Sequence, residues 1–258
     1  MTGSVKPDEA GNAGSDDRAD RAGPGAEAAA TDARKHRWTS HRDQRTREFV
    51  DAALRVLDAE GPELLMDSVA AEAGVSKPVL YRYFSDKAAL IAALAERGSE
   101  LLRARLMPAI NSNGPVLDRI SGAVGAYFAV IDEHPNLYWL IARRDFADLS
   151  RGWAAVHPDR ESIANALTAV IGDYLRMFEL DSGAAEPWAN GVVGLVQATG
   201  EWWLRRRSMS RAHVVAYVTE LIWAALTGIM RDAGVEIDPD KPLPVVRPRL
   251  SIRRADQS

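Results

Sequence analysis

Residues 68–90 read SVAAEAGVSKPVLYRYFSDKAAL, and this stretch decides the fold. Its first part predicts a short helix that ends before Gly74, because glycine readily adopts the backbone angles of a tight turn. A second short helix begins after Ser76, a residue type preferred at N-caps, and Pro78 falls in its first turn, where a missing amide hydrogen costs nothing. Asp86 then predicts the N-cap of a longer helix. The pattern is that of a helix-turn-helix.

The apolar residues of this stretch are spaced to fill a small core between the two short helices and a preceding helix. They are Val69, Ala70, Ala73, Val75, Leu80 and Phe84. The same spacing is expected to turn the remaining side chains of the second helix outward, namely Lys77, Val79, Arg82 and Tyr83. An exposed helix of this length fits the major groove of B-form DNA.

Each outward side chain suits a particular atom of the duplex. Lys77 or Arg82 could donate to guanine O6 and N7, and the methyl groups of Val79 could touch a thymine methyl. Phosphate oxygens suit the hydroxyls of Tyr81 and Tyr83. Lys87 adds positive charge in the first turn of the longer helix, whose amides already attract an anion.

The segment from Ser68 to Leu90 resembles the DNA-binding signature of TetR-type transcriptional regulators, and the resemblance covers about Thr46 to Leu94. Leu65 departs from the family pattern, which usually has a capping hydroxyl there, and Asp67 stands where a polar or basic residue often contacts DNA. The resemblance implies DNA contacts at the positions of Ser76, Lys77, Pro78, Val79, Tyr81, Tyr83 and Lys87.

A basic stretch precedes the helix-turn-helix. Residues 34–47 hold six basic side chains and one acidic side chain. Arg45 and Thr46, at the start of the first helix, could contact the DNA backbone, and the arginines of the stretch could enter the minor groove. A solvated charged segment without DNA contacts is an equally good interpretation.

The rest of the chain predicts helices and no sheet, because no segment shows alternating apolar residues bounded by turn residues. The expected helices are about 43–60, 66–73, 77–84, 87–107, 116–133, 136–148, 159–180, 185–207 and 211–233. The predicted fold is all-α, with an N-terminal three-helix DNA-binding domain and a C-terminal helical domain for ligand sensing and dimerisation. The predicted regions are a disordered leader with a basic end (1–38), the helix-turn-helix domain (39–92), the sensing domain (93–234) and a proline- and arginine-rich tail (235–258).

Composition excludes several classes of function. The 258 residues contain no cysteine, which excludes disulfides, thiol nucleophiles and Cys-ligated metals. The net charge of −4 argues against a protein that coats DNA nonspecifically. The longest uncharged stretch, Pro187 to Gly200, is shorter than the roughly 18 residues that cross a bilayer, and no signal peptide is visible, so a cytoplasmic protein is expected. The five histidines show no metal-ligand spacing, and no catalytic motif occurs, so we predict no enzyme, no cofactor and no metal.

Two-fold symmetry is expected, because one short reading helix binds DNA weakly and a dimer doubles the contacts on a palindromic site. Small residues on the last two helices permit close backbone approach, and the resemblance implies that these helices pair across the dimer. The candidate interface residues are Gly191, Gly194, Ala198, Ala224 and Gly228. Close packing inside one protomer explains the small residues nearly as well.

Aromatic residues concentrate in the C-terminal part, and most are expected to be core. The resemblance implies a ligand pocket enclosed by the middle helices, and its candidate lining is Tyr127, Tyr138, Trp139, Arg143 and Trp153. Apolar walls with few polar anchors suit an apolar or amphipathic ligand.

The sequence therefore predicts a homodimeric, ligand-responsive regulator that leaves a palindromic operator in double-stranded DNA when a small molecule binds. In the family such regulators are most often repressors. One rival is a carrier of apolar ligands, or an enzyme, whose helix-turn-helix does not read DNA; another is a protein that compacts DNA nonspecifically.

Overall fold

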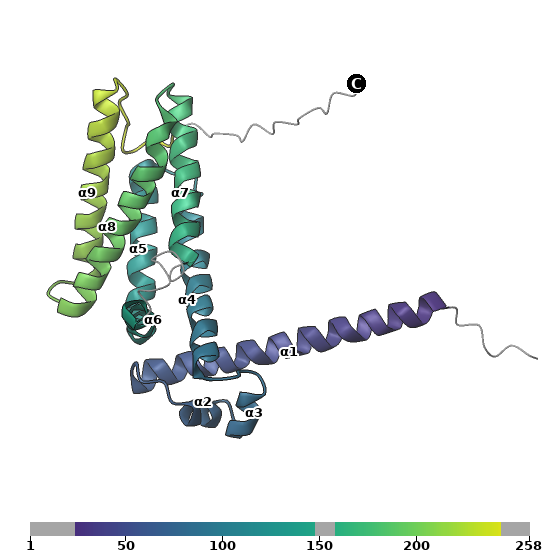
Figure 1. Cartoon of the computed structure of the whole chain (residues 1–258). Coiled ribbons are helices and arrows are strands. Elements are labelled where there is room, and N and C mark those ends of the chain that lie inside the picture. The colour runs from purple at the N-terminus through teal and green to yellow at the C-terminus, as the bar shows by residue number, and fades with distance from the viewer. Residues whose placement is uncertain (1–23, 148–157, 244–258) are drawn as a thin grey trace, which may run out of the picture. The chain divides into compact units, whose positions relative to one another are not determined.

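A computed structural model describes residues 24–147 and 158–243 of the chain (Figure 1). Within these residues the regular structure is helical, and the β-type pairing is one isolated bridge between Pro115 and Pro242. The all-α prediction is confirmed. The helices are α1 (Pro24–Glu60), α2 (Met66–Glu72), α3 (Lys77–Tyr81), α4 (Lys87–Ile110), α5 (Val116–Glu133), α6 (Pro135–Ala147), α7 (Pro158–Met177), a short 3-10 turn (Ser182–Ala184), α8 (Ala185–Arg206) and α9 (Arg211–Asp232).

Helix α1 begins at Pro24, well before the expected start near Asp43, so the prediction of a disordered leader is wrong for residues 24–38. The leader was expected to be disordered because it has too few large apolar residues to bury, and helix propensity was not taken into account. Residues 24–33 are rich in alanine, the best helix former, and proline is favoured in the first turn. The chain divides within α1 into two units, Met1–Thr46 and Arg47–Ser258.

The predicted turn between α2 and α3 has the expected geometry. Gly74 has φ +65°, and the amides of Gly74 and Val75 donate to the carbonyls of Ala71 and Ala70 at 3.0 and 2.9 Å. These two hydrogen bonds form a Schellman motif, which closes the end of α2. Asp86 caps α4, since its carboxylate accepts from the amide of Ala89 at 2.7 Å. Ser76 occupies the N-cap of α3 without a side-chain capping bond.

The core of the helix-turn-helix domain joins α1 through α4 and the first turn of α6. The fully buried residues of this core include Leu57, Val69, Leu80 and Leu90, and Phe49 has only 1% of its surface exposed. Two of the residues expected in this core, Ala73 and Val75, are only partly buried but pack against it.

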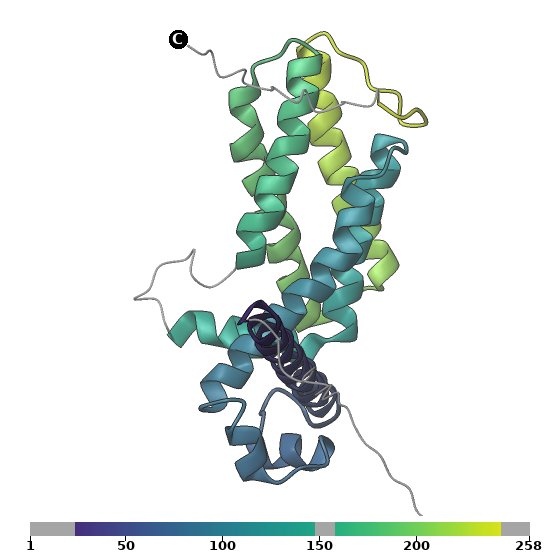
Figure 2. The same ribbon diagram turned by 90° about the vertical axis from the view of Figure 1, so that its right-hand side faces the viewer.

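Helix α4 reaches from this core into the C-terminal bundle, as both views show (Figures 1 and 2). Leu90, Ile91 and Leu94 lie in the core of the helix-turn-helix domain, whereas Leu106 and Ile110 are buried at the far end of the helix. The helix continues through Pro108, where the sequence suggested a boundary, with one backbone hydrogen bond missing there because proline has no amide hydrogen.

Two further clusters form the bundle. One centres on Phe128 of α5, Trp203 of α8 and Val214 of α9, and the other on Leu175 of α7, Ala185 of α8 and Met230 of α9. Helices α5, α7, α8 and α9 therefore enclose the space between them from several sides.

Candidate nucleic-acid interface and ligand cavity

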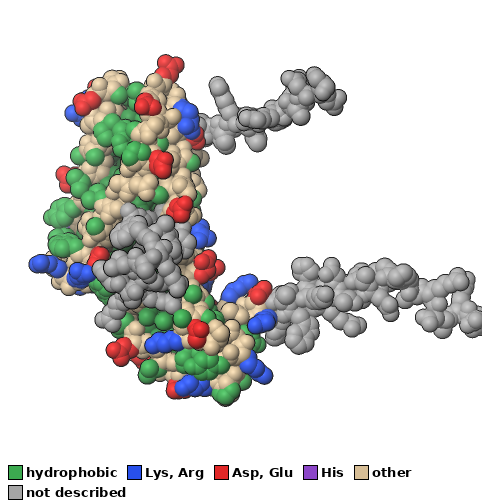
Figure 3. All heavy atoms as spheres, viewed as in Figure 1, with side chains coloured by type: hydrophobic (Ala, Val, Ile, Leu, Met, Phe, Trp, Pro, Cys, Tyr) green, Lys and Arg blue, Asp and Glu red, His purple; other side chains and the backbone are tan. Residues whose placement is uncertain are grey.

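The surface around α3 exposes most of the residues predicted to contact DNA. Leu80 and Phe84 anchor the segment, with 0% and 4% of their surface exposed. This anchoring leaves an exposed set in unit Arg47–Ser258: Ser76, Lys77, Pro78, Tyr81, Arg82 and Lys87. Lys87 is the first residue of α4, as predicted. Figure 3 shows basic, acidic and apolar side chains intermixed over this part of the molecule.

Lys77 is not an unpaired cation on this surface. Its ammonium Nζ lies 2.9 Å from Oδ2 of Asp67, the second residue of α2. The hydrogen bond that Lys77 donates to Asp67 raises the pKa of Lys77 above its ordinary value. The sequence identified Asp67 as a departure from the family pattern but gave no sign that it pairs with the reading helix. Both side chains are exposed, so the pair can open at low cost.

Tyr83 and Val79 do not turn fully outward, which corrects the prediction for these two side chains. Both are half-buried and pack against the helix-turn-helix core. The ring of Tyr83 meets that of Phe49 edge to face, with centroids 4.9 Å apart. The physical reason is that α3 ends at Tyr81, so the following turn brings Tyr83 back toward α1. Tyr81 is the more exposed tyrosine, at 41%.

Arg45 and Thr46 lie in the unit Met1–Thr46, and both are half-buried. The hydroxyl Oγ1 of Thr46 donates to the carbonyl of Arg42 at 2.9 Å, one helical turn earlier. That bond satisfies the hydroxyl within α1. A phosphate contact by Thr46 therefore requires its hydroxyl to donate to the phosphate instead of to Arg42, because a phosphate oxygen only accepts.

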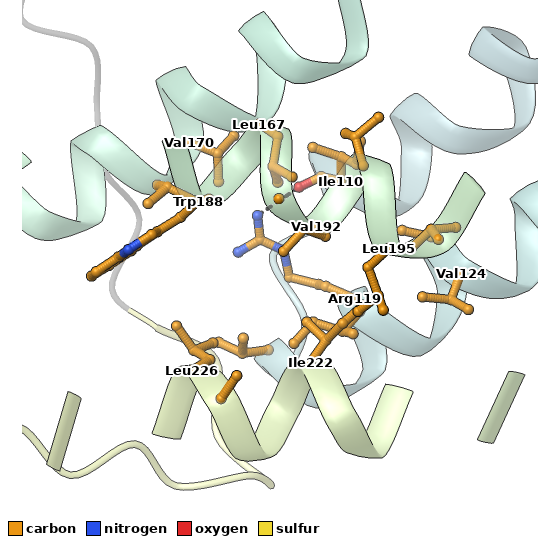
Figure 4. Close-up of a pocket in the computed structure, with 18 of the residues that line it drawn as sticks. Ile110, Arg119, Val124, Leu167, Val170, Trp188, Val192, Leu195, Ile222 and Leu226 are labelled. Carbon is orange, nitrogen blue, oxygen red and sulfur yellow. Dashed lines mark hydrogen bonds between the residues drawn. The ribbon is translucent and has the colours of Figure 1, made fainter. Parts of the chain in front are cut away.

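A cavity of about 490 Å³ lies in the C-terminal bundle, within the range of about 300 to 1,000 Å³ typical of small-molecule sites. Figure 4 shows its walls, with Leu167 and Val170 of α7, Trp188, Val192 and Leu195 of α8, and Ile222 and Leu226 of α9. Nearly all of the lining is aliphatic or aromatic. The end of α4 also contributes, through Leu106 and Ile110.

Four polar side chains interrupt the apolar lining: Arg119, Tyr127, Tyr174 and Gln197. Arg119 of α5 donates to the hydroxyl of Tyr174 at 2.9 Å and to the carbonyl of Ile110 at 2.5 Å. Tyr127 has 7% of its surface exposed, and its hydroxyl has no hydrogen-bond partner among the described residues. Burial raises the pKa of Tyr127 far above its ordinary value, so the hydroxyl keeps its proton.

The structure places the predicted lining residues in different surroundings. Tyr127 lines the cavity, whereas Tyr138 and Trp139 do not. These two rings contact each other edge to face at 5.3 Å and pack beside the Phe128 cluster, and the guanidinium of Arg205 lies over Trp139. Their surroundings agree with the expectation that most aromatic residues belong to the core. The side chain of Arg143 and the whole of Trp153 lie outside the described residues.

Arg119 is the residue that sequence reasoning missed. The signal that could have found it was a lone arginine on α5, a helix otherwise apolar on the face that carries Val116, Ile120 and Ala123. A cation at helical spacing with core residues points inward rather than to solvent.

The outer faces of α8 and α9 are apolar and exposed (Figure 3, left edge). Exposed residues there include Tyr217, Leu221 and Ile229, at 57%, 54% and 39%. Of the candidate interface residues, Gly191, Ala198 and Ala224 are exposed, and Gly194 and Gly228 are half-buried. The space beside two of these glycines is open, because a Cβ atom placed on Gly191 or Gly228 would have no neighbouring atom within 4 Å.

Helix α9 is long and apolar enough, by length and composition, to cross a bilayer. Its most apolar window has a mean hydropathy of 1.4, and 22% of that window is buried in the structure. A bundle helix with an uncovered apolar face passes the same test. Among the described residues, no group of three or more His, Asp or Glu side chains is arranged to hold a metal ion.

Comparison with known proteins covers both domains. Residues 49–94 match the family model described as bacterial regulatory proteins, tetR family, and residues 105–236 match that described as tetracyclin repressor-like, C-terminal domain. The HTH-type transcriptional regulator Rv0472c of Mycobacterium tuberculosis strain H37Rv is 32% identical over 205 residues, 79% of this chain and 86% of its own. The HTH-type transcriptional activator FasR of Mycolicibacterium smegmatis is 28% identical over 190 residues, 73% of this chain and 85% of its own.

Solved structures share the fold. A tetR-family regulator from Streptomyces coelicolor aligns with a TM-score of 0.59 and 25% identity, over 74% of this chain and 83% of that one. The regulator FadR from Bacillus subtilis, in complex with stearoyl-CoA, aligns with a TM-score of 0.53 and 16% identity, over 68% of this chain and 96% of that one.

Proposed function

The chain belongs to the TetR family of transcriptional regulators, and on that premise we propose that it is a homodimer that binds a palindromic operator and releases it when an amphipathic ligand enters the bundle. The observation that carries the proposal is the exposed surface of α3 on a closed core, combined with a ligand-sized cavity in the same unit. A rigid anchor and an exposed polar face are what direct readout of base edges requires.

The contacts to DNA divide into two classes. Lys77 and Arg82 are the candidates for base readout, because their side chains are exposed on or directly after α3. Tyr81, Lys87 and the hydroxyl of Ser76 are the candidates for phosphate contacts, which position the helix without reading sequence. The proposed interface of this unit is completed by Pro78, Val79 and Tyr83. Arg45 and Thr46, in the unit Met1–Thr46, are separate candidates for DNA contacts.

Dimerisation through α8 and α9 explains their uncovered apolar faces. The open space beside Gly228 allows the backbone of a second protomer to approach closely, and Gly191 is exposed at the edge of the cavity. Two reading helices related by a two-fold axis then meet two half-sites about one helical turn of DNA apart.

Helix α4 supplies the physical link between cavity and DNA, since it lines the cavity at Ile110 and lies in the helix-turn-helix core at Leu90 and Leu94. A ligand acts through this link only by its difference in affinity for the DNA-bound and released conformations. The stearoyl-CoA bound to the Bacillus FadR supports an amphipathic ligand for this fold.

The direction of regulation is part of the proposal. Repression by an unliganded dimer is the expectation, although the relative FasR is an activator. The proposal includes no catalytic step and places the protein in the cytoplasm, where regulators of this family generally act.

Selection of DNA from a random library with the purified full chain tests the proposal. We expect an enriched palindrome and a Kd for it between about 10⁻⁸ and 10⁻¹¹ M at physiological salt. Enrichment of no sequence, with affinities of only about 10⁻⁴ to 10⁻⁶ M, would contradict the proposal and favour a ligand carrier or nonspecific binder. A reporter gene under the selected site then separates repression from activation.

A further inference from the structure

We propose that Arg119 is the anion-recognition residue of the cavity and that the ligand is a single-chain amphiphile with a carboxylate head. This inference rests on the proposed function, since it names the ligand class of the same cavity.

Arg119 is the one charged side chain among the described residues that line the cavity. Figure 4 shows its guanidinium reaching from α5 into the space bounded by Leu167, Trp188 and Val192. A full positive charge against apolar walls is unfavourable unless an anion or several hydrogen bonds compensate it. The cavity therefore has a marked preference for negative charge at this point.

The partners of Arg119 hold its guanidinium by hydrogen bonds and a ring contact but bring no negative charge to it. Both of its hydrogen-bond acceptors are neutral, the hydroxyl of Tyr174 and the carbonyl of Ile110, and the guanidinium carbon lies 5.6 Å from the centre of the Tyr174 ring. No carboxylate among the described residues forms an ion pair with it. A guanidinium has five N–H donors in a planar fork, which suits the two oxygens of a carboxylate.

The cavity has no second polar group as well placed as Arg119. The hydroxyl of Tyr127 has no hydrogen-bond partner among the described residues, but it is shielded and lies beside Gly200 of α8, which is not part of the lining. The rest of the lining is apolar and suits the chain of the amphiphile.

The position of Arg119 also explains how occupancy could reach the DNA. The carbonyl that it holds belongs to Ile110, the last residue of α4. A carboxylate is a stronger acceptor than a neutral carbonyl, so a bound head group competes with Ile110 for the same donors. Loss of this hydrogen bond would loosen the end of the helix whose other end lies in the helix-turn-helix core.

The test compares dodecanoate, dodecanol and dodecanoyl-coenzyme A as competitors of a neutral fluorescent naphthylamine dye bound to the full chain. We expect dodecanoate to bind at least about tenfold more tightly than dodecanol in the wild type, as a charged hydrogen-bonded pair provides. Arg119→Gln should reduce that ratio to less than about twofold and leave the affinity for dodecanol unchanged. Arg119→Lys should keep part of the preference, and the control Arg231→Gln, on the exposed end of α9, should keep all of it.

Other results would overturn the inference. If the wild type binds dodecanoate and dodecanol equally well, the inference is wrong without any result from a variant. Arg119 would then have only a structural role, which is to connect α4 and α7 through its hydrogen bonds. A carboxylate preference that survives Arg119→Gln, or binding of the thioester alone with no effect of Arg119→Gln, also contradicts it. DNA binding, measured by fluorescence anisotropy on the selected operator, is independent: its failure beside an intact carboxylate preference contradicts the proposed function only.

Discussion

The ammonium of Lys77 lies 2.9 Å from the carboxylate of Asp67, so the helix expected to read DNA is paired with an anion from the helix before it. A DNA phosphate or guanine must compete with Asp67 for the same ammonium. The carboxylate also adds negative charge beside a polyanion. Asp67 therefore sets how readily Lys77 is released for DNA.

Asp67→Asn should strengthen binding to the selected operator, by up to about fivefold, because an exposed ion pair is worth about 0.2 to 1 kcal/mol. Titration by fluorescence anisotropy at two salt concentrations measures the change. Asp118→Asn on α5 removes the same charge from an exposed site outside the proposed interface and serves as the control. Equal gains for the two variants would show a general charge effect rather than release of Lys77.

Lys77→Ala and Lys87→Ala should separate base readout from phosphate contact. Loss of Lys77 should flatten the ranking of operator variants, because a bidentate contact to guanine discriminates by about 1 to 3 kcal/mol. Loss of Lys87 should weaken all sequences by a similar factor and reduce the salt dependence by about one unit of slope. A panel of single-base operator variants checks both, and identical profiles for the two variants would contradict the assigned roles.

Tyr83 should respond differently to two substitutions, because its ring packs on Phe49 with centroids 4.9 Å apart while the side chain stays half-exposed. Tyr83→Ala should lower the free energy of unfolding by about 1 to 3 kcal/mol, less than a fully buried aromatic would. Tyr83→Phe should leave stability unchanged and isolate the contribution of the hydroxyl to DNA affinity. Urea denaturation and anisotropy on the same samples make the comparison. A stable Tyr83→Ala would contradict the packing role.

The sequence predicted the fold well where local chemistry decides it. Gly74 and Asp86 have the turn and cap roles that their residue types suggested, because these depend only on neighbouring backbone. Tyr83 and Arg119 were misjudged or missed because their environment is made by residues distant in sequence, Phe49 for one and Tyr174 for the other. The candidates Tyr138 and Trp139 lie outside this cavity for the same reason, since helical spacing cannot tell that they pack beside the Phe128 cluster instead.

Ala224→Arg should convert the proposed dimer to a monomer, because it places a charge on the exposed apolar face of α9 and outside the cavity lining. Ala104→Arg, at an exposed position of α4, is the matched control. Sedimentation velocity at micromolar concentration reports the oligomeric state, and operator affinity should fall together with dimer content. A dimeric Ala224→Arg would place the interface elsewhere.

The last prediction concerns the joint between the helix-turn-helix domain and the bundle. The side-chain amide of Asn136, in the first turn of α6, donates to the carbonyl of Leu57 in α1 at 2.8 Å, and His134 Nδ1 lies 3.0 Å from a carboxylate oxygen of Asp58. Leu137 is buried in the same helix-turn-helix core. These contacts attach α6 to α1 independently of α4.

Removing the polar contacts with His134→Ala and Asn136→Ala together should loosen the attachment without opening either core. Each hydrogen bond contributes about 0.5 to 1.5 kcal/mol, so the loss is small against global stability but large for a local opening. Hydrogen exchange followed by mass spectrometry should then show faster exchange in α2 and α3 and unchanged exchange in α8 and α9. Asn190→Ala, whose amide bonds only within α8, is the control. Uniformly faster exchange throughout the chain would show instead that the two domains open as one cooperative unit. The contacts would then contribute to the free energy of global unfolding and not to a local opening.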